Sequence, residues 1–305
     1  MSRAMESPAP RTHAPDDQAT RLRLLVSSLR ARDRAPSLEP PATPPVVTRP
    51  QARVITVASG KGGVGKSCVS VCLASAMAAH GQRVTLLDAD FGTANADVLC
   101  GVLPRVRLDV LMHGRNDADL TQIAIETPWS FHLVPGAVGS ASASAQDAPP
   151  RTRVLDAVRS LDPLSDRIIV DTCAGIGPEV LQMVQFADVA AIVVTPDPSS
   201  IADAYALLKV LAMAPVPEWA PPSRTLGLVL NQVTDETEAL RVHGRIATTA
   251  DRFLGWRVPM LGWIPSDEAL RRAVRARRAP EVSLDAEASS GKAFRRLASD
   301  LLHPR

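Results

Sequence analysis

Lysine is scarce in this 305-residue chain, since only four of its 34 basic residues are lysine and the others are arginine. The four are Lys61, Lys66, Lys209 and Lys292. We interpret this bias as a property of the gene's base composition, so two lysines within eight residues, Lys61 and Lys66, mark an unusual segment. The formal net charge of +2 is close to neutral. By itself it does not indicate a nucleic-acid-binding protein.

Cysteine is also rare, and the four residues (Cys68, Cys72, Cys100 and Cys173) include no CxxC pair. No His/Cys cluster has the spacing of zinc ligands, which excludes a zinc-ribbon type of protein. Cys68 and Cys72 lie four residues apart on an expected helix, where they could share a ligand or be buried thiols. The second alternative is favoured. This cysteine usage predicts a reducing compartment.

Long apolar runs are missing. The N-terminal segment is polar and proline-rich, without the apolar core of a secretory signal. No run reaches the roughly 18 apolar residues that a membrane-spanning helix needs. We therefore expect a soluble, cytoplasmic protein.

The first 50 residues differ in composition from the rest. Residues 1–15 are rich in Pro, Ala and Arg, which predicts disorder. A short amphipathic helix is expected within 16–31, where apolar residues recur at helical spacing (Leu22, Leu25, Val26 and Leu29). Six prolines in 35–50 predict an extended linker. We expect this tail over 1–50, a catalytic domain over 51–282 and an amphipathic helix over 283–305.

From Arg53 onward, strand-like and helix-like segments alternate. The strand-like runs are continuously apolar, as expected when both faces of a sheet are covered. The alternation predicts an α/β fold, a doubly wound and mainly parallel sheet with helices on both faces. Strands are expected at Val54–Ala58, Arg83–Leu87, Phe131–Val134, Arg167–Val170, Val189–Thr195, Thr225–Leu230 and Val258–Ile264. Helices include Ser67–Ala79, Ser199–Ala212 and Glu236–Leu254, and 135–150 is expected to be a surface loop.

Residues 60–67 read GKGGVGKS, which fits the P-loop pattern G-x-x-x-x-G-K-[ST] between a strand and a helix. Glycines let backbone N–H groups surround phosphate oxygens, and the helix N-terminus adds positive charge. Lys66 is expected to reach the β- and γ-phosphates, and Ser67 to ligate Mg²⁺. The pattern predicts ATP and Mg²⁺ as cofactors. The expected phosphate-binding residues are Gly60, Gly62, Gly63, Val64, Gly65, Lys66, Ser67 and Cys68.

Three aspartates end apolar strands. Asp88 and Asp90 are two apart, so both face the same side at a strand's carboxyl end, where doubly wound sheets bind ligands. One can support Mg²⁺ while the other positions water, although a solvated acid pair is the alternative. Asp171 follows the strand at 167–170 as a Walker B aspartate does, and it is expected to hold Mg²⁺ through water.

Over residues 53–282 these motifs resemble the MinD/ParA superfamily, whose P-loop carries an extra lysine (the deviant Walker A box). The resemblance implies that Lys61 reaches a partner subunit's nucleotide in an ATP-bound homodimer, so Lys61, Lys66 and Asp90 are the expected catalytic residues. The match of residues 88–95 to the family's DxDxxxxN region implies that Asp90 positions the attacking water. It places Asp88 near the metal, with Ser67 and Asp171.

The same resemblance extends to the base of the nucleotide. Asn231 matches a family asparagine that reads the edge of adenine, and residues 262–267 match the segment G-x-I-P-x-D that flanks the ring. Asn231, Pro265 and Asp267 are therefore expected cofactor-binding residues.

Several segments are similar to the FlhG (FleN) branch, which regulates flagellar number and placement (88–102, 195–211, 230–233 and 267–280). Residues 17–26 resemble a segment, DQAxxLRxLV, that engages the signal-recognition-type GTPase FlhF in that branch and is missing from MinD and ParA. The alternative for 17–26 is a generic frayed helix. The N-terminal tail is longer and richer in proline than the family's.

Two later segments leave alternatives open. Residues 290–302 place Phe294, Leu297 and Leu301 on one helical side, which fits either a membrane interface or docking on the domain. The arginine run at 271–278 fits either a solvated helix or a polyanion site, and the first is favoured.

The resemblance implies a slow, switch-type ATPase that is a membrane-bound dimer with ATP and a cytoplasmic monomer with ADP, and that controls flagellar number. One alternative is a ParA-like partition ATPase that binds DNA non-specifically, although nucleic acid is not favoured. Another is MinD-like positioning of the division site. An iron–sulfur carrier of the Mrp type is set aside, since it needs a C-terminal CxxC.

Overall fold

The computed structural model describes residues 50–109, 119–137 and 151–303. The predictions for the N-terminal tail, its helix at 16–31 and residues 138–150 of the expected loop therefore lie outside the described residues. Within the described part, no helix is long and apolar enough to cross a membrane.

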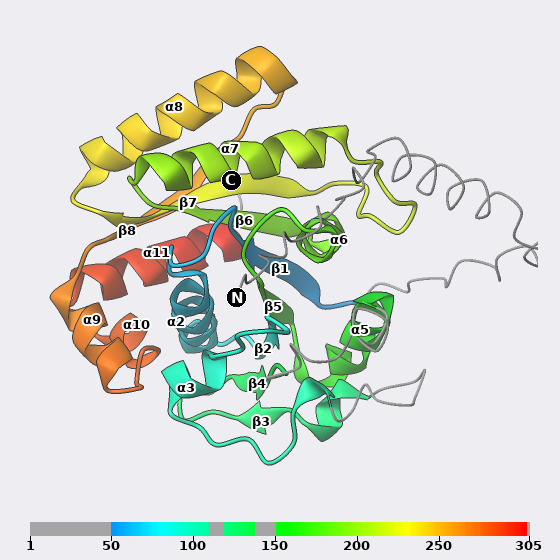
Figure 1. The fold of residues 1–305 in the computed structure, drawn as a ribbon. Coiled ribbons are helices and arrows are strands. Elements are labelled where there is room, and N and C mark those ends of the chain that lie inside the picture. Colours follow the sequence, from blue (N-terminus) through cyan, green and yellow to red (C-terminus); the bar gives the residue numbers. More distant parts are fainter. Residues whose placement is uncertain (1–49, 110–118, 138–150, 304–305) are drawn as a thin grey trace, which may run out of the picture. The chain divides into compact units, whose positions relative to one another are not determined.

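An eight-stranded sheet in the order β3-β4-β2-β5-β1-β6-β7-β8 forms the centre of the domain (Figure 1). Neighbouring strands are parallel except at one edge, where β3 and β4 are antiparallel. This confirms the predicted doubly wound, mainly parallel sheet. The strands are β1 (Arg53–Ala58), β2 (Val84–Ala89), β3 (Ile125–Glu126), β4 (His132–Val134), β5 (Arg167–Thr172), β6 (Val189–Val194), β7 (Thr225–Val233) and β8 (Met260–Pro265).

Helices cover both faces of this sheet, with α2 and α11 on one face and α7 and α8 on the other (Figure 1). The helices are α2 (Lys66–Ala79), α3 (Ala96–Cys100), α5 (Arg151–Val158), α6 (Pro178–Phe186), α7 (Pro198–Met213), α8 (Glu236–Leu254), α9 (Glu268–Arg275), α10 (Glu281–Leu284) and α11 (Ser289–Leu302). The described ranges also contain the 3₁₀ segments η1 (Leu120–Gln122) and η3 (Arg159–Leu164).

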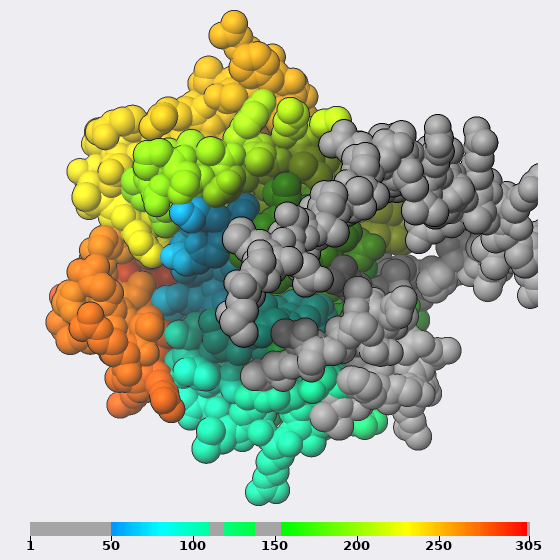
Figure 2. Space-filling model, in the orientation of Figure 1, coloured from blue at the N-terminus to red at the C-terminus, as the bar shows by residue number. Residues whose placement is uncertain are grey.

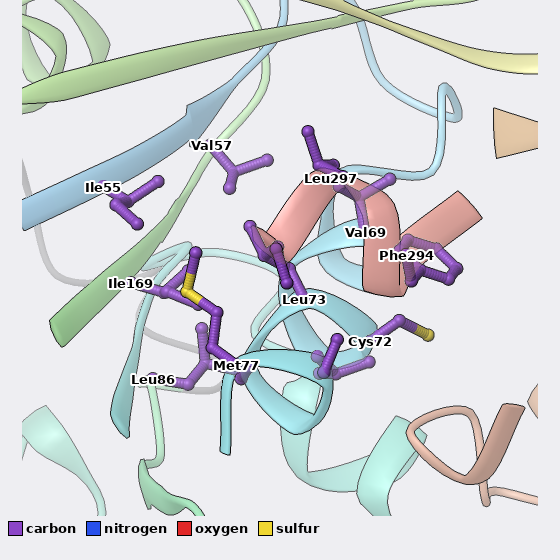
Figure 3. Packing of buried hydrophobic residues seen from close by; sticks show 14 of the residues in the cluster. Ile55, Val57, Val69, Cys72, Leu73, Met77, Leu86, Ile169, Phe294 and Leu297 are labelled. Carbon is purple, nitrogen blue, oxygen red and sulfur yellow. The ribbon is translucent and has the colours of Figure 1, made fainter. Parts of the chain in front are cut away.

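The alternation of side chains along β1 shows why its sequence is continuously apolar. Ile55 and Val57 enter the core on the α2 side, whereas Val54 and Ala58 enter cores on the opposite side. Both sets are buried because β1 is central and each face carries a helix layer. In Figure 3 the side chains of α2, Leu73 among them, lie between the strands and α11.

The C-terminal helix α11 docks on the domain. Its apolar residues Phe294, Leu297, Leu301 and Leu302 are buried against α2 and β8. Figure 3 shows Phe294 and Leu297 beside the side chains of α2. Of the two alternatives for 290–302, this structure has the helix docked on the domain, and membrane contact through these residues stays a prediction.

Candidate functional site

The P-loop lies between β1 and α2, at the carboxyl ends of the central strands, as its sequence predicts. Gly63 and Gly65 have φ angles of +80° and +91°, which residues with a Cβ rarely adopt. Glycine is required at Gly65 for a second reason, because a Cβ there would lie 2.5 Å from the Asn231 amide nitrogen. At Gly60, a Cβ would overlap the backbone carbonyl of Asp203 in α7. The loop is thus fitted closely to the helices and strands around it.

A cleft of ≈ 510 Å³ lies over this loop. It brings together most of the predicted phosphate-binding residues and one predicted catalytic aspartate. Lys66, the first residue of α2, is only 7% exposed and lines the cleft. The lining residues are Gly62, Gly63, Gly65, Lys66, Ser67, Cys68, Asp90, Thr93, Asn95, Leu99, Cys173 and Ala174.

Asp88 and Asp171 are both buried, and they lie opposite each other in the register of β2 and β5. The sequence placed Asp171 just after its strand, whereas β5 continues through Thr172 because β1 and β2 pair with it on both sides. Burial, followed by repulsion from Asp88, raises the pKa of Asp171 to about 7. Burial likewise raises the pKa of Asp88 to about 6, although backbone N–H groups that hydrogen-bond to it oppose the rise.

The two carboxylates differ in what they contact. Asp88 accepts backbone hydrogen bonds from Asp90, Asn95 and Ala96 at 3.0 to 3.1 Å, so it fixes the start of α3. Asp171 accepts one from the Ser70 hydroxyl at 3.1 Å, and its second oxygen, Oδ2, is buried without a hydrogen-bond partner in the described structure. A buried carboxylate oxygen without a partner is costly unless a ligand satisfies it.

These oxygens fit the Mg²⁺ ion that the P-loop pattern predicts. Mg²⁺ prefers carboxylate, hydroxyl and water oxygens. The Ser67 hydroxyl supplies a further oxygen near Asp171, where it partly opposes the rise in the pKa of that carboxyl. When bound, the ion neutralises phosphate charge. Ser67 and the free oxygen of Asp171 are the groups that we expect to face it, while Asp88 orients the loop that follows β2.

Asp90 lies at the rim of the phosphate cleft and is partly exposed. Its carboxylate accepts hydrogen bonds from the backbone of Gly92 and Thr93 and from the Thr93 hydroxyl, the last at 2.9 Å. The side chain is thereby held at the edge where a water molecule can approach. Its assignment as the residue that orients water stays a prediction.

The side chain of Lys61, in the P-loop, contacts the beginning of α7 in its own chain. Its ammonium group donates to the Ser199 hydroxyl at 2.5 Å and is 3.6 Å from the Asp197 carboxylate. Asp197 also caps α7 through the Ser199 backbone N–H. Sequence reasoning missed both partners, because Ser199 is 138 positions away and Asp197 is 136, and no local pattern links residue 61 to them.

A second cleft of ≈ 420 Å³ adjoins the first, and Gly65 and Cys68 line both. Three predicted base-binding residues, Asn231, Pro265 and Asp267, line it. The Asn231 amide donates to the carbonyl of Val64 at 2.8 Å and so ties β7 to the P-loop. The remaining lining residues are Gln232, Ser266, Leu270, Arg271, Val274 and Arg275.

Helix α9 gives this second cleft an apolar wall that the sequence analysis did not assign. Leu270 and Val274 are one helical turn apart and both line the cleft. Their spacing of four residues was the feature of the sequence that could have indicated this apolar side of the helix. Arg271 and Arg275 line the same cleft, and Arg271 pairs with Glu268 at 2.7 Å. Two residues of the arginine run are thus part of the cleft.

The carboxylate of Asp267 is used within the protein. One oxygen caps α9 through the Ala269 backbone N–H at 2.8 Å, and the other accepts hydrogen bonds from Ser289 and Ser290 at the start of α11. Partial burial raises the pKa of Asp267, but the hydrogen bonds outweigh this effect and lower it to about 2. Asp267 therefore joins the second cleft to α11.

The cysteines are not arranged as a metal site. Cys72 is buried and hydrogen-bonds through its thiol to the carbonyl of Ala279, and burial raises its pKa well above the ordinary value. No group of three or more His, Cys, Asp and Glu residues in the described ranges could hold a metal ion on its own. Cys68, partly exposed, lines both clefts instead.

Comparison with known proteins agrees with this geometry. Residues 55–280 match the CobQ/CobB/MinD/ParA nucleotide binding domain. The chain is 37% identical over 232 residues to the antiactivator FleN of Pseudomonas aeruginosa, a match that covers 74% of this chain and 78% of FleN. It is 34% identical over 233 residues to the flagellum site-determining protein YlxH of Helicobacter pylori, with 74% of each chain covered.

Among solved structures, the septum site-determining protein MinD of Pyrococcus horikoshii, complexed with Mg-ADP, has a TM-score of 0.64 and 26% identity. That match covers 82% of this chain and 96% of that protein. Since the family domain spans well over half of the chain and carries its phosphate cleft, the protein belongs to the CobQ/CobB/MinD/ParA family and is a nucleotide-binding ATPase of the MinD/ParA type.

Proposed function

We propose that this protein is an ATP-dependent dimerising switch that controls flagellar number and placement. The observation that carries the proposal is the 37% and 34% sequence identity with FleN and YlxH over about three quarters of the chain. The P-loop with Lys61 lies within residues 55–280, which match the family domain. The output of such a switch is a conformational state, so a low rate of hydrolysis suffices.

The site supports specific roles. Lys66 lies in the phosphate cleft and would bind the β- and γ-phosphates. Lys61 would exchange Ser199 and Asp197 for the partner subunit's nucleotide, and Asp90 would orient the attacking water. The second cleft would receive adenine between the Asn231 side and the apolar wall of α9.

Two substitutions test the switch. Asp90→Ala should bind ATP and accumulate as a dimer, because hydrolysis would be slowed while nucleotide binding stays intact. Lys66→Ala should bind ATP poorly and remain a monomer, because it lacks the phosphate-binding cation. Size-exclusion chromatography with light scattering, with Mg-ATP and with Mg-ADP, measures both. An Asp90→Ala protein that binds ATP and still elutes as a monomer contradicts the dimer switch.

The partner is the second part of the proposal. Residues 17–26 resemble the FlhF-binding segment and lie outside the described residues. The full-length chain should retain FlhF of the same organism in a pull-down, and a chain that lacks residues 1–35 should not, although its ATP binding is unchanged. Equal retention of FlhF by both chains contradicts this assignment and leaves a general MinD-like ATPase.

A further inference from the structure

Gln232 is the extra residue of a bulge at the end of β7. From Asn231 to Val233 the strand advances two residues, while its partner β8 advances only one, from Ile264 to Pro265. Gln232 therefore has no partner residue in β8, and the register of the two strands shifts at this point. Bulges are frequent beside active sites, where they change the direction of a side chain.

The backbone of Gln232 has a conformation that glutamine rarely adopts. Its φ angle is +60°, in the left-handed region, where a Cβ approaches a neighbouring carbonyl oxygen too closely. Among the described residues with a Cβ, only Ser130 and Arg277 share a positive φ. Glycine would take this conformation without strain, so the stability of the bulge does not explain a long amide side chain at this position.

The side chain of Gln232 is exposed and lines the second cleft. Its amide nitrogen lies 3.7 Å from the position that a Cβ on Gly65 would take, which places it beside the P-loop. This amide makes no hydrogen bond with another residue of the described ranges. Figure 2 shows the P-loop and α2 (blue), the residues that follow β7 (yellow) and α9 (orange) on one face of the molecule. The amide is thus open to a ligand on that face.

The neighbouring Asn231 is placed differently. It is only 5% exposed, and its amide nitrogen donates to the carbonyl of Val64. This amide therefore holds the P-loop against β7. Gln232, one residue later, presents both the donors and the acceptor of its amide to the cleft. The family resemblance indicated Asn231 and gave no role to Gln232.

We propose that Gln232 hydrogen-bonds the nucleoside of bound ATP where the two clefts meet. The inference rests on the proposed placement of adenine in the second cleft. With the phosphates on the P-loop, the nucleoside leaves the phosphate cleft beside Gly65 and Cys68, the residues that line both clefts. The Gln232 amide lies beside this path, and adenine and ribose offer donors and acceptors that it can satisfy. The bulge directs the amide to this place, and Leu270 and Val274 line the same cleft with apolar groups.

Gln232→Met tests the proposal in the full-length protein, because methionine keeps the length of the side chain and removes the amide. Calorimetry should show that the variant binds Mg-ATP about tenfold more weakly than wild type, as expected for one lost hydrogen bond. The hydrolysis rate at saturating ATP should stay within about twofold of wild type, because this contact is made equally in the ground state and the transition state.

The matched control is Gln122→Met, which changes an exposed glutamine of η1 outside both clefts. It should bind Mg-ATP as wild type does. Without nucleotide, both variants should unfold at the wild-type temperature, because both side chains are exposed. A loss of affinity in Gln232→Met alone then reports a lost contact with the ligand.

The inference is overturned if Gln232→Met binds Mg-ATP as tightly as wild type, or if the control loses as much affinity. It is also overturned if the hydrolysis rate at saturating ATP falls as much as the affinity does, since the substitution would then have displaced the P-loop. A wild-type protein that binds no Mg-ATP would contradict the proposed nucleotide site itself. Equal binding by wild type and Gln232→Met contradicts only the role of Gln232.

Discussion

At the scale of single residues, the buried acid pair sets the electrostatics of the site. Asp88 and Asp171 lie in register on adjacent strands, and burial holds both pKa values near the middle of the pH scale. Sequence reasoning recognised both aspartates by their position after apolar runs. It could not predict their mutual repulsion, which depends on which strands pair.

This pair predicts a pH dependence for the protein without nucleotide and Mg²⁺. A carboxyl whose folded pKa is raised costs no stability below its unfolded pKa, and stability falls as pH rises through the folded pKa. For Asp171 this window runs from about 4 to about 7. Asp171→Asn should therefore lose fewer degrees of Tm than wild type between pH 5 and pH 8 in EDTA. Thermal unfolding measures the difference, and Asp251→Asn, at an exposed site, is the control. Identical slopes for wild type and Asp171→Asn would reject the shifted pKa.

At the scale of elements, helix ends determine how the second cleft is built. Asp267 caps α9 with one oxygen and holds the start of α11 with the other. The sequence indicated a base-binding residue here, by resemblance. The contacts add a structural role, because Ser289 and Ser290 are 22 and 23 residues away and no local pattern indicates them.

Asp267→Asn should lower the free energy of unfolding by about 1 kcal/mol near neutral pH, a modest value because the group is largely solvated. The folded pKa is lowered to about 2, so the wild-type advantage is present above pH 4 and is lost as pH falls toward 2. Urea unfolding at pH 7 and pH 3 measures it, with Asp300→Asn as the control. If the difference in free energy of unfolding between wild type and Asp267→Asn does not shrink at low pH, the ionised carboxylate of Asp267 is not its source.

The C-terminal helix provides a second prediction at this scale. Phe294 is fully buried between α11 and α2, whereas Phe253 on α8 is 65% exposed. Phe294→Ala should lower the free energy of unfolding by about 3–5 kcal/mol. The matched Phe253→Ala should change it by less than about 0.5 kcal/mol. Equal losses in urea unfolding would mean that α11 is not part of the core.

At the scale of the whole molecule, the parallel direction of the strands follows from local patterns together with general rules of α/β folds. Continuous apolar runs that alternate with helices predicted a parallel sheet, and the sheet is parallel apart from β3. β3 has only two residues, too few for a pattern to be recognised. The short helices α3 and α10 were missed for the same reason.

The sequence by itself determined the chemistry of the phosphate cleft, because glycines, lysine and serine at fixed spacing between a strand and a helix define the local backbone. The tertiary structure decided which distant groups meet: Lys61 with Ser199, Asp171 with Asp88, Asp267 with Ser290, and α11 with α2. These pairings depend on packing between segments far apart in the chain. The periodicity of one helix specifies that an apolar side will be buried, but the neighbour that buries it is selected only when the whole core forms.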